Sequence, residues 1–256
     1  TFGNNTVIGG AVTGGAGADT LTIQGAITAT IGGGTGNDLF VLGTAASVTG
    51  TLDGGAGVDE ILASSNATTF VINAVDSGAV TGQVDAFINV ENLTGGAGND
   101  VFQFETGGRL TAGVVNGGAG TDTLDGDLNS NNFVISGTDS GTYDSDQATG
   151  GEVVFLNVES LDGRSGNDRF RFTSLGVLTD VLLGGAGLDE LVASNNGDVF
   201  HVTATNAGTL YDGPGLTNPR TVNGFLSVEN LTGGDGEDTF DIDADVFGNL
   251  IGGGGN

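Results

Sequence analysis

A short glycine-rich pattern recurs along the whole chain and limits the folds that the chain can adopt more than any other feature. Each copy reads Gly-Gly-x-Gly-x-Asp-x-apolar, and the copies cover residues 14–21, 33–40, 54–61, 95–102, 117–124, 184–191 and 233–240, with a degraded copy at 163–170. The motif aspartates are Asp19, Asp38, Asp59, Asp100, Asp122, Asp168, Asp189 and Asp238. Their gaps of 19, 21, 41, 22, 46, 21 and 49 residues cluster near one or two lengths of about 21, which indicates a repeat architecture.

A longer period groups these copies into super-repeats. A second signature, Asn-Val-Glu-Asn-Leu or a close variant, covers residues 89–93, 157–161 and 227–231. Super-repeats of 63, 67 and 68 residues therefore begin at Gly54, Gly117 and Gly184, and the composition does not shift between them. The sequence predicts one continuous array over residues 1–256. It consists of a partial unit (1–53), three super-repeats (54–116, 117–183 and 184–251) and the start of a further unit (252–256).

Between the motifs, apolar and polar residues alternate with a period of two, as in residues 101–104, 169–172 and 239–242. This alternation is typical of short strands that bury one face, and no stretch shows helical periodicity. Two short strands and two turns in about 20 residues make one coil. We therefore predict an all-β fold, a parallel β-solenoid of the β-roll or β-helix kind. Its core is predicted to stack the rings of Phe102, Phe104, Phe170, Phe172 and Phe240.

We interpret the second turn of each predicted coil as a degenerate copy of the same nine-residue unit. Nine residues after a motif Asp, and two before a Phe, stand Thr68, Asn131 and Asp198. Each super-repeat also contains a coil without the motif, around residues 77–78, 140–141 and 207–208. The longer excursions at 138–152 and 204–221 are predicted to be decorating loops.

Composition excludes several classes of function. The chain has 51 Gly, 32 Asp and Glu, and only five basic residues, all of them Arg, so its formal net charge is −27. Nucleic acids and anionic membranes need a basic surface, so the composition nearly excludes a nucleic-acid partner and disfavours an anionic membrane surface. No apolar run is long enough to predict a transmembrane segment. The absence of Cys excludes disulfides and zinc–thiolate sites, and a single His and two Tyr leave little material for an enzyme.

The motif itself has two interpretations. At a single copy the turn explains the residues, because glycine adopts positive φ without strain and Asp can cap its own backbone. Stacking of many copies favours another interpretation, because coils about 4.8 Å apart align the carboxylates. Neighbouring charges at that distance repel by roughly 1 kcal/mol in water and roughly 3.5 kcal/mol at an effective dielectric constant near 20. A hard divalent cation with oxygen ligands would relieve this repulsion, and calcium is favoured.

The chain resembles the RTX, or haemolysin-type calcium-binding, repeat proteins. Residues 54–62, 95–103 and 184–192 satisfy every fixed place of the family's nonapeptide G-G-x-G-x-D-x-U-x. The resemblance implies a parallel β-roll in which Ca²⁺ lies between turns one full coil apart. Carried over, it pairs Asp19 with Asp38, Asp38 with Asp59, Asp100 with Asp122, Asp168 with Asp189, and Asp238 with the turn at Gly252.

The ligands that the resemblance implies are the motif Asp carboxylates together with carbonyls of the turns. The turn residues are Gly15, Gly17, Gly34, Gly36, Gly55, Gly57, Gly96, Gly98, Gly118, Gly120, Gly166, Gly185, Gly187, Gly234 and Gly236. The chain departs from typical RTX blocks because one side of the roll is largely without the motif, which implies fewer ions per coil. The string V-E-N-L-T-G-G-x-G-N-D-x-F at 90–102, with a variant at 228–240, also resembles very long bacterial surface proteins and adhesins.

Other polar residues have competing interpretations. Glu91, Glu159 and Glu229 of the second signature are either outward, solvated side chains or groups that bind calcium or the adjacent turn. Asn37, Asn99 and Asn167 are interpreted as turn formers, and His201 as a surface residue.

These observations predict a structural protein and no enzymatic activity. We expect a calcium-stiffened repeat segment of an exported bacterial surface protein, such as a fibre, stalk or adhesin shaft, outside the cell or on its surface. Neither end of the sequence offers a polar cap, so like repeats of the same or neighbouring chains are expected to stack head to tail. The alternative is an RTX-type secretion, accessory or carbohydrate-binding module of a larger secreted toxin or enzyme. Only Tyr143, Tyr211 and Arg109 would serve a sugar-binding face, which argues against that role.

Overall fold

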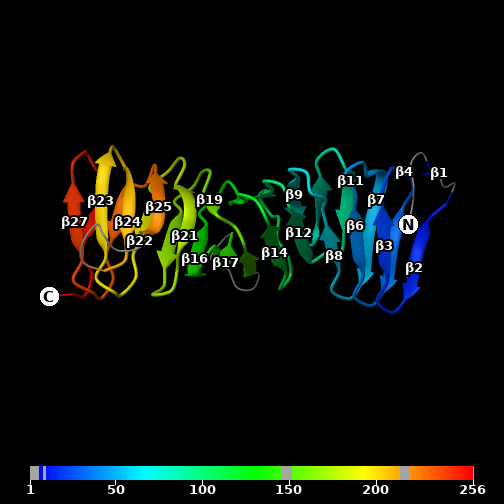
Figure 1. The fold of residues 1–256 in the computed structure, drawn as a ribbon, viewed down its shortest axis with the longest axis horizontal. Coiled ribbons are helices and arrows are strands. Elements are labelled where there is room, and N and C mark those ends of the chain that lie inside the picture. The colour runs from blue at the N-terminus through cyan, green and yellow to red at the C-terminus, as the bar shows by residue number, and fades with distance from the viewer. Residues whose placement is uncertain (1–5, 8–9, 146–151, 214–219, 256) are drawn as a thin grey trace. The chain divides into compact units, whose positions relative to one another are not determined.

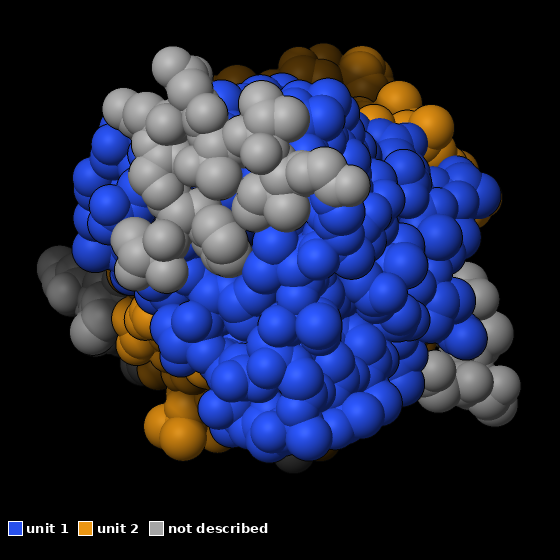
Figure 2. All heavy atoms as spheres, turned by 90° about the vertical axis from the view of Figure 1, so that its right-hand side faces the viewer, with its two compact units in different colours: residues 1–122, 150–153 blue, residues 123–149, 154–256 orange. Residues whose placement is uncertain are grey.

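The computed structural model describes residues 6–7, 10–145, 152–213 and 220–255. In these residues every regular element is a β-strand, so none of the described elements is a helix that could span a membrane. Two compact units are distinguished by their internal contacts, one of residues 1–122 and 150–153 and the other of residues 123–149 and 154–256 (Figure 2). The division between them follows Asp122 and falls inside the second predicted super-repeat.

In unit 1, the chain passes back and forth between two sheets (Figure 1). One sheet has the order β3-β6-β8-β12-β14, and the other has the order β1-β4-β7-β11-β10-β9-β13, with β2 pairing β5 and β5 pairing β7. The strands are β1 (Thr6–Val7), β2 (Val12–Ala16), β3 (Thr20–Ile23), β4 (Ala26–Thr28), β5 (Ile31–Thr35), β6 (Leu39–Leu42), β7 (Ser47–Ala56), β8 (Glu60–Leu62), β9 (Thr69–Ala74), β10 (Ser77–Val80), β11 (Val84–Ile88), β12 (Asn92–Gly96), β13 (Val101–Phe104) and β14 (Val114–Gly118).

Unit 2 repeats this arrangement. Its sheets have the orders β15-β19-β21-β25-β24-β23-β27 and β28-β26-β22-β20-β16-β17-β18. The strands are β15 (Thr123–Asp125), β16 (Asn132–Gly137), β17 (Ser140–Asp144), β18 (Val153–Leu156), β19 (Ser160–Asp162), β20 (Arg169–Phe172), β21 (Leu178–Leu183), β22 (Glu190–Val192), β23 (Val199–Ala204), β24 (Ala207–Tyr211), β25 (Arg220–Leu226), β26 (Asn230–Thr232), β27 (Thr239–Ile242) and β28 (Leu250–Ile251).

The repeat length of the sequence sets the register of the parallel pairs. Thr20 of β3 pairs with Leu39 of β6, which in turn pairs with Glu60 of β8. In unit 2, β20 and β22 pair in the same way, with Arg169 opposite Glu190. Each pair joins residues one motif spacing apart, so successive glycine turns come to lie one above another. The all-β prediction is confirmed.

The prediction that the strands are all parallel is wrong, because the segments without the motif run antiparallel. Strand β10 lies antiparallel between β9 and β11, and β24 lies in the same way between β23 and β25. Strand β17 pairs antiparallel with β16. A residue at positive φ lies in each reversing turn, and these residues are Asp76 (48°), Asp139 (47°) and Asn206 (51°). A residue in this left-handed conformation lets a short turn reverse the direction of the chain, whereas the predicted coil would have kept successive strands parallel.

These antiparallel strands also correct the prediction of decorating loops. Residues 138–152 contribute β17, and residues 204–221 contribute β24, so both excursions add a strand to a sheet. The remaining parts at 146–151 and 214–219 lie outside the described residues.

A glycine facing an aromatic ring allows each inserted strand to pack closely. A Cβ on Gly78 would lie 2.0 Å from the carbonyl oxygen of Val71 and 2.8 Å from Cζ of Phe87. Gly141 has the same environment in unit 2, since its Cβ would lie 2.7 Å from Cζ of Phe155. The ring therefore covers the strand at the place where a side chain is missing.

Aromatic stacks fill the core of each unit. The rings of Phe70 and Phe102 lie 5.0 Å apart and 3° from parallel, and those of Phe133 and Phe170 lie 4.8 Å apart and 4° from parallel. The predicted core residues Phe102, Phe104, Phe170 and Phe172 are buried, whereas Phe240 on β27 is partly exposed.

Phe170→Ala is expected to lower the free energy of unfolding by about 3–5 kcal/mol, because it removes a fully buried ring from a stack. Urea denaturation followed by circular dichroism measures the change. Phe247→Ala is the control in the same unit. Phe247 is 72% exposed, so this substitution should change the free energy of unfolding by no more than about 0.5 kcal/mol. Equal costs for the two variants would contradict the assignment of the stack to the core.

Candidate functional site

The motif turns fold closely, and glycine occupies their first two places except in the degraded copy, where Arg164 stands at the second place with a φ of 65°. A Cβ on Gly33 would lie 2.2 Å from Oδ2 of Asp38 and 2.6 Å from the carbonyl oxygen of Gly54. Gly34 has a φ of 119°, and its Cβ would lie 2.0 Å from the carbonyl oxygen of Gly15. The aspartate therefore folds back over its own turn, and the next turn lies directly against it.

Most of the predicted turn glycines share the left-handed conformation. Positive φ is found at Gly15, Gly17, Gly34, Gly36, Gly55, Gly57, Gly96, Gly118, Gly120, Gly166, Gly185 and Gly187. Gly98, Gly234 and Gly236 do not share it. These three glycines lie against degenerate copies of the motif. A Cβ on Gly98 would lie 2.4 Å from Asn66, one on Gly234 would lie 1.8 Å from Ser194, and one on Gly236 would lie 2.1 Å from Gly197. Close approach, and not backbone conformation, accounts for glycine there.

The motif aspartates form a hydrogen-bonded ladder. The backbone N–H of Asp19 donates to Oδ1 of Asp38 at 2.8 Å, and the N–H of Asp38 donates to Oδ1 of Asp59 at 2.7 Å. Asp38 and Asp59 are almost completely buried. Each rung thus fixes the backbone of one turn with the carboxylate of the next.

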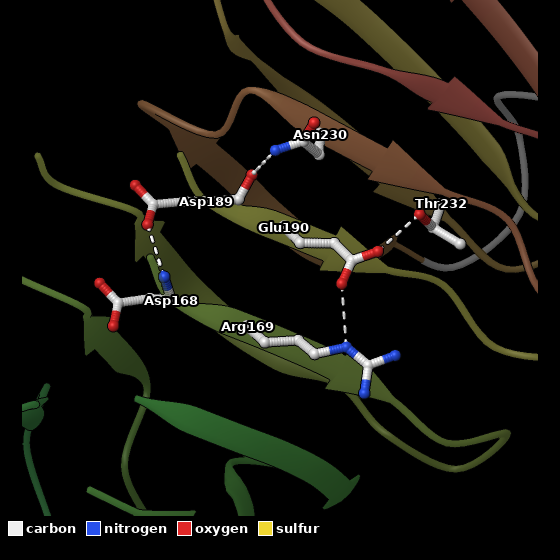
Figure 3. Close-up of polar contacts among 6 residues, drawn as sticks. All are labelled: Asp168, Arg169, Asp189, Glu190, Asn230 and Thr232. Carbon is white, nitrogen blue, oxygen red and sulfur yellow. Dashed lines mark hydrogen bonds and ion pairs between the residues drawn. The ribbon is translucent and has the colours of Figure 1, made fainter. Parts of the chain in front are cut away.

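The other predicted pairs are brought together in the same way. The N–H of Asp100 donates to Oδ1 of Asp122 at 2.7 Å, and the N–H of Asp168 donates to Oδ1 of Asp189 at 2.8 Å (Figure 3). The turn at Gly252 lies beside Asp238, because a Cβ on Gly233 would be 2.2 Å from Asp238 Oδ2 and 2.8 Å from the Gly252 carbonyl oxygen. The structure therefore places every predicted pair of turns in contact.

Two of the signature glutamates continue the ladder. Oε2 of Glu91 accepts a hydrogen bond from the N–H of Asp59 at 2.8 Å, and Oε2 of Glu229 accepts one from the N–H of Asp189 at 2.9 Å. Of the two interpretations of these residues, the bond to the adjacent turn is confirmed. In Glu229 the second oxygen also accepts a hydrogen bond, from Nδ2 of Asn206 at 2.9 Å.

The ladder also contains three residues that the sequence did not identify as members. The backbone N–H groups of Thr68, Asn131 and Asp198 donate to Oδ1 of the motif Asp of the next turn, at 2.7, 2.7 and 2.8 Å. All three are buried. Their shared position, nine residues after a motif Asp, is the signal that could have revealed them.

Several carboxylates of the ladder have one oxygen that the protein leaves unsatisfied. Oδ2 is buried and has no hydrogen-bond partner among the described residues in Asp19, Asp38, Asp59, Asp100, Asp168 and Asp189. Buried polar atoms of native proteins are nearly always bonded, so a row of such atoms indicates a missing partner. In Asp238 the corresponding oxygen accepts a weak bond from the N–H of Gly234 at 3.1 Å.

Burial shifts the ionisation of the ladder. Loss of solvation raises the pKa of Asp168 to about 7, against lowering by the bonds from Asn131, and the negative charges of Asp189 and Asp127 add to the increase. Burial likewise raises the pKa values of Asp189 and Asp198 to about 6. For Asp59, Asp100, Asp122, Asp238 and Glu91, burial again raises the pKa.

Arg169 and His201 bind carboxylates outside the ladder. Nε of Arg169 pairs with Oε2 of Glu190 at 2.9 Å, on the strands that follow Asp168 and Asp189 (Figure 3). His201 lies between two surface carboxylates, with Nε2 3.8 Å from Asp241 Oδ2 and 3.5 Å from Asp243 Oδ2.

The atoms around the ladder that could coordinate a cation are oxygens. At Gly33 a carboxylate oxygen of Asp38 and the carbonyl oxygen of Gly54 both lie close to the position that a Cβ would take, at 2.2 and 2.6 Å. The described residues contain no group of three or more His, Asp or Glu side chains that could hold a metal ion. A cation at the ladder would therefore depend on backbone carbonyls for most of its ligands, as hard cations can.

No family model, no curated protein and no solved structure matches the chain. The resemblance to RTX repeats thus stays a prediction, and the function is inferred from the chain's own residues.

The ion-free protein is expected to lose stability as the pH rises from about 4 to about 7. The unfolded carboxyl of Asp168 titrates near 3.8 and the folded one near 7, so over this range the folded form binds the additional proton. The stabilisation is complete below the unfolded pKa and is lost as the pH rises through the folded pKa. Urea midpoints measured in EDTA over this range test the sign.

Asp168→Asn should reduce that dependence on pH, because the amide keeps the Oδ1 acceptor and removes the titrating group. Asp235→Asn, on the exposed surface of the same unit, should leave it unchanged. A pH profile that is the same in Asp168→Asn as in the unchanged chain would contradict the assignment.

Proposed function

We propose that the chain is a structural repeat segment, a calcium-stiffened β-solenoid of an exported surface protein. The observation that carries the proposal is the ladder of buried carboxylates with unsatisfied oxygens. No catalytic role is proposed, because the carboxylates of the ladder bind the backbone N–H groups of adjacent turns.

The order of the strands supports the solenoid. In unit 1 the chain passes from β5 in one sheet to β6 in the other, then to β7 and back to β8. Each return brings a strand into parallel register with the strand one motif earlier, as β8 is with β6. A chain that winds around a common core makes this pattern, and the antiparallel strands are then insertions within a coil.

The chemistry of the ladder supports calcium. Burying ionised carboxylates is costly unless they are paired, and the chain has 32 acidic against five basic residues. When bound, calcium would supply positive charge to oxygens that have no protein partner. Asp38, Asp59 and their counterparts would hold it through Oδ2, together with carbonyls of the glycine turns. Carboxylate and carbonyl oxygens in irregular geometry suit calcium better than the stricter octahedral demand of magnesium.

Dependence on calcium supports a location outside the cell or on its surface. A cation that binds only the folded chain adds to its stability in proportion to the logarithm of its concentration. The chain would stay weakly folded where free calcium is scarce and become rigid where it is abundant, which suits a protein that crosses a membrane unfolded. The absence of Cys is compatible with this location.

Like repeats are the partner we propose for the edge of unit 2. Among the described residues β27 pairs on one side with β23, and β28 pairs on one side with β26. Apolar side chains are exposed on these strands and beside them, at Ile242, Phe247, Leu250 and Ile251. A further coil of the same or a neighbouring chain would cover both edges and these side chains.

Calcium is expected to stabilise the metal-stripped chain at pH 7.5, by about 2.7 kcal/mol per site at one hundred times the dissociation constant. The measurement is the urea midpoint and the far-ultraviolet circular dichroism in EDTA, in calcium and in magnesium. Asp38→Asn should show a smaller gain with calcium, because it retains the acceptor Oδ1 but loses the charge at Oδ2.

Asp85→Asn is the matched control, since Asp85 is an exposed residue of the same unit and lies outside the ladder. It should respond to calcium as the unchanged chain does. If calcium alters neither the spectrum nor the midpoint of the unchanged chain, the calcium-stiffened segment is ruled out.

A further inference from the structure

The side chain of Asn131 fills a cage of oxygens in unit 2. It is completely buried, and four acceptors surround its Nδ2 at 2.8–3.2 Å. They are the carbonyl oxygens of Asp127 (3.1 Å), Asn129 (2.8 Å) and Gly163 (3.2 Å) and Oδ1 of Asp168 (2.8 Å). An amide has two hydrogens for these four oxygens, so the cage has more acceptors than a carboxamide can satisfy.

The orientation of this amide is set from its other side. Oδ1 of Asn131 accepts hydrogen bonds from the N–H of Asp127 at 3.1 Å and from the hydroxyl of Tyr143 at 3.0 Å. Tyr143 is itself buried, with its ring 5.0 Å from that of Phe133. Two donors on the oxygen side leave the NH₂ group to face the cage.

Asp198 occupies the same place in the next super-repeat but carries no amide hydrogens. Its N–H donates to Oδ1 of Asp238, as that of Asn131 does to Asp168. Oδ2 of Asp198 accepts a bond from Oγ of Ser194 at 2.9 Å, and Ser194 precedes Asp198 by four residues, as Asp127 precedes Asn131. Oδ1 of Asp198 is buried without a partner among the described residues, in a side chain that is fully buried.

The third member of the set, Thr68, is neutral. Its hydroxyl donates to the carbonyl oxygen of Asn66 at 3.1 Å, the residue that corresponds to Asn129 in the Asn131 cage. The same backbone position thus holds a hydroxyl, an amide and a carboxylate in the three super-repeats.

We propose that the Asn131 carboxamide takes the place of a cation, and that the equivalent cage at Asp198 and Asp238 binds a divalent cation of the calcium class. The inference rests on the proposed function, because it assigns which rungs need an ion. At Asn131 the amide hydrogens supply positive charge to the carbonyls and to Asp168. At Asp198 the side chain has no amide hydrogens, and its buried Oδ1 has no hydrogen-bond partner among the described residues, so this rung carries two carboxylates, Asp198 and Asp238, and no side-chain N–H to offset their charge. The residue nine places after the motif Asp therefore decides whether a rung depends on a cation.

The test compares the intact chain with Asp198→Asn, Asn131→Asp and the control Asp85→Asn. Bound calcium per chain is measured by equilibrium dialysis with atomic emission, and the urea midpoint is measured in EDTA at pH 8. Asp198→Asn should bind less calcium than the unchanged chain and unfold at higher urea in EDTA, because the amide fills its cage. Asn131→Asp should bind more calcium and unfold at lower urea in EDTA, with the loss reversed by calcium.

The outcomes separate this inference from the proposed function. If the unchanged chain binds calcium and Asp198→Asn binds the same amount, the inference is wrong and the proposed function stands. If the unchanged chain binds no calcium, both are wrong. Asp198→Asn decides the result even if Asn131→Asp fails to fold, since the former is expected to fold better than the unchanged chain.

Discussion

The structure depends on a hydrogen bond from the backbone N–H of one turn to the buried carboxylate of the next. Its length is 2.8 Å between Asp19 and Asp38, which are 19 residues apart, and 2.8 Å between Asp198 and Asp238, which are 40 residues apart. The length of the intervening chain varies because extra residues form antiparallel strands such as β24. The next motif turn nevertheless reaches the same register. The rung is thus conserved in geometry while the length of the repeat is not.

That bond has an electrostatic consequence. Directing a carboxylate inward to meet an N–H removes it from water, and burial raises the pKa of Asp168 to about 7 because the charged form loses solvation. The hydrogen bonds to Oδ1 of Asp168 do not restore the solvation that is lost, since Oδ2 of Asp168 stays buried without a partner among the described residues, and Arg169 pairs with Glu190 on the adjoining strands. At the rungs whose Oδ2 lacks a partner, a proton, an amide hydrogen or the proposed cation would offset this cost. The inward direction of the carboxylates therefore both fixes the backbone of the turns and leaves negative charge with little solvation.

The part of this arrangement that depends on side chains could be predicted from the sequence. Asp38 and Asp59 recur with their glycines, so the period and the acidic pairs were visible. The rungs at Thr68 and Asn131 were not predicted, because these residues carry no carboxylate, although their position nine residues after a motif Asp was visible in the sequence. The antiparallel strands were missed for a related reason. The segment around Gly78 was interpreted as a coil without the motif. In the structure it is an antiparallel strand, and Gly78 leaves room for the ring of Phe87.

A shared backbone hydrogen bond makes the side-chain differences between super-repeats informative. Asn131 and Asp198 donate the same backbone bond at 2.7 and 2.8 Å, so the fold does not distinguish them. Their side chains differ in whether they bring hydrogens or a second negative charge to the turn carbonyls. If the proposed cation sites exist, the local stability of a rung would then depend on the charge of this side chain. Different rungs would consequently respond to cations over different concentration ranges, and a graded response of this kind requires no change of fold.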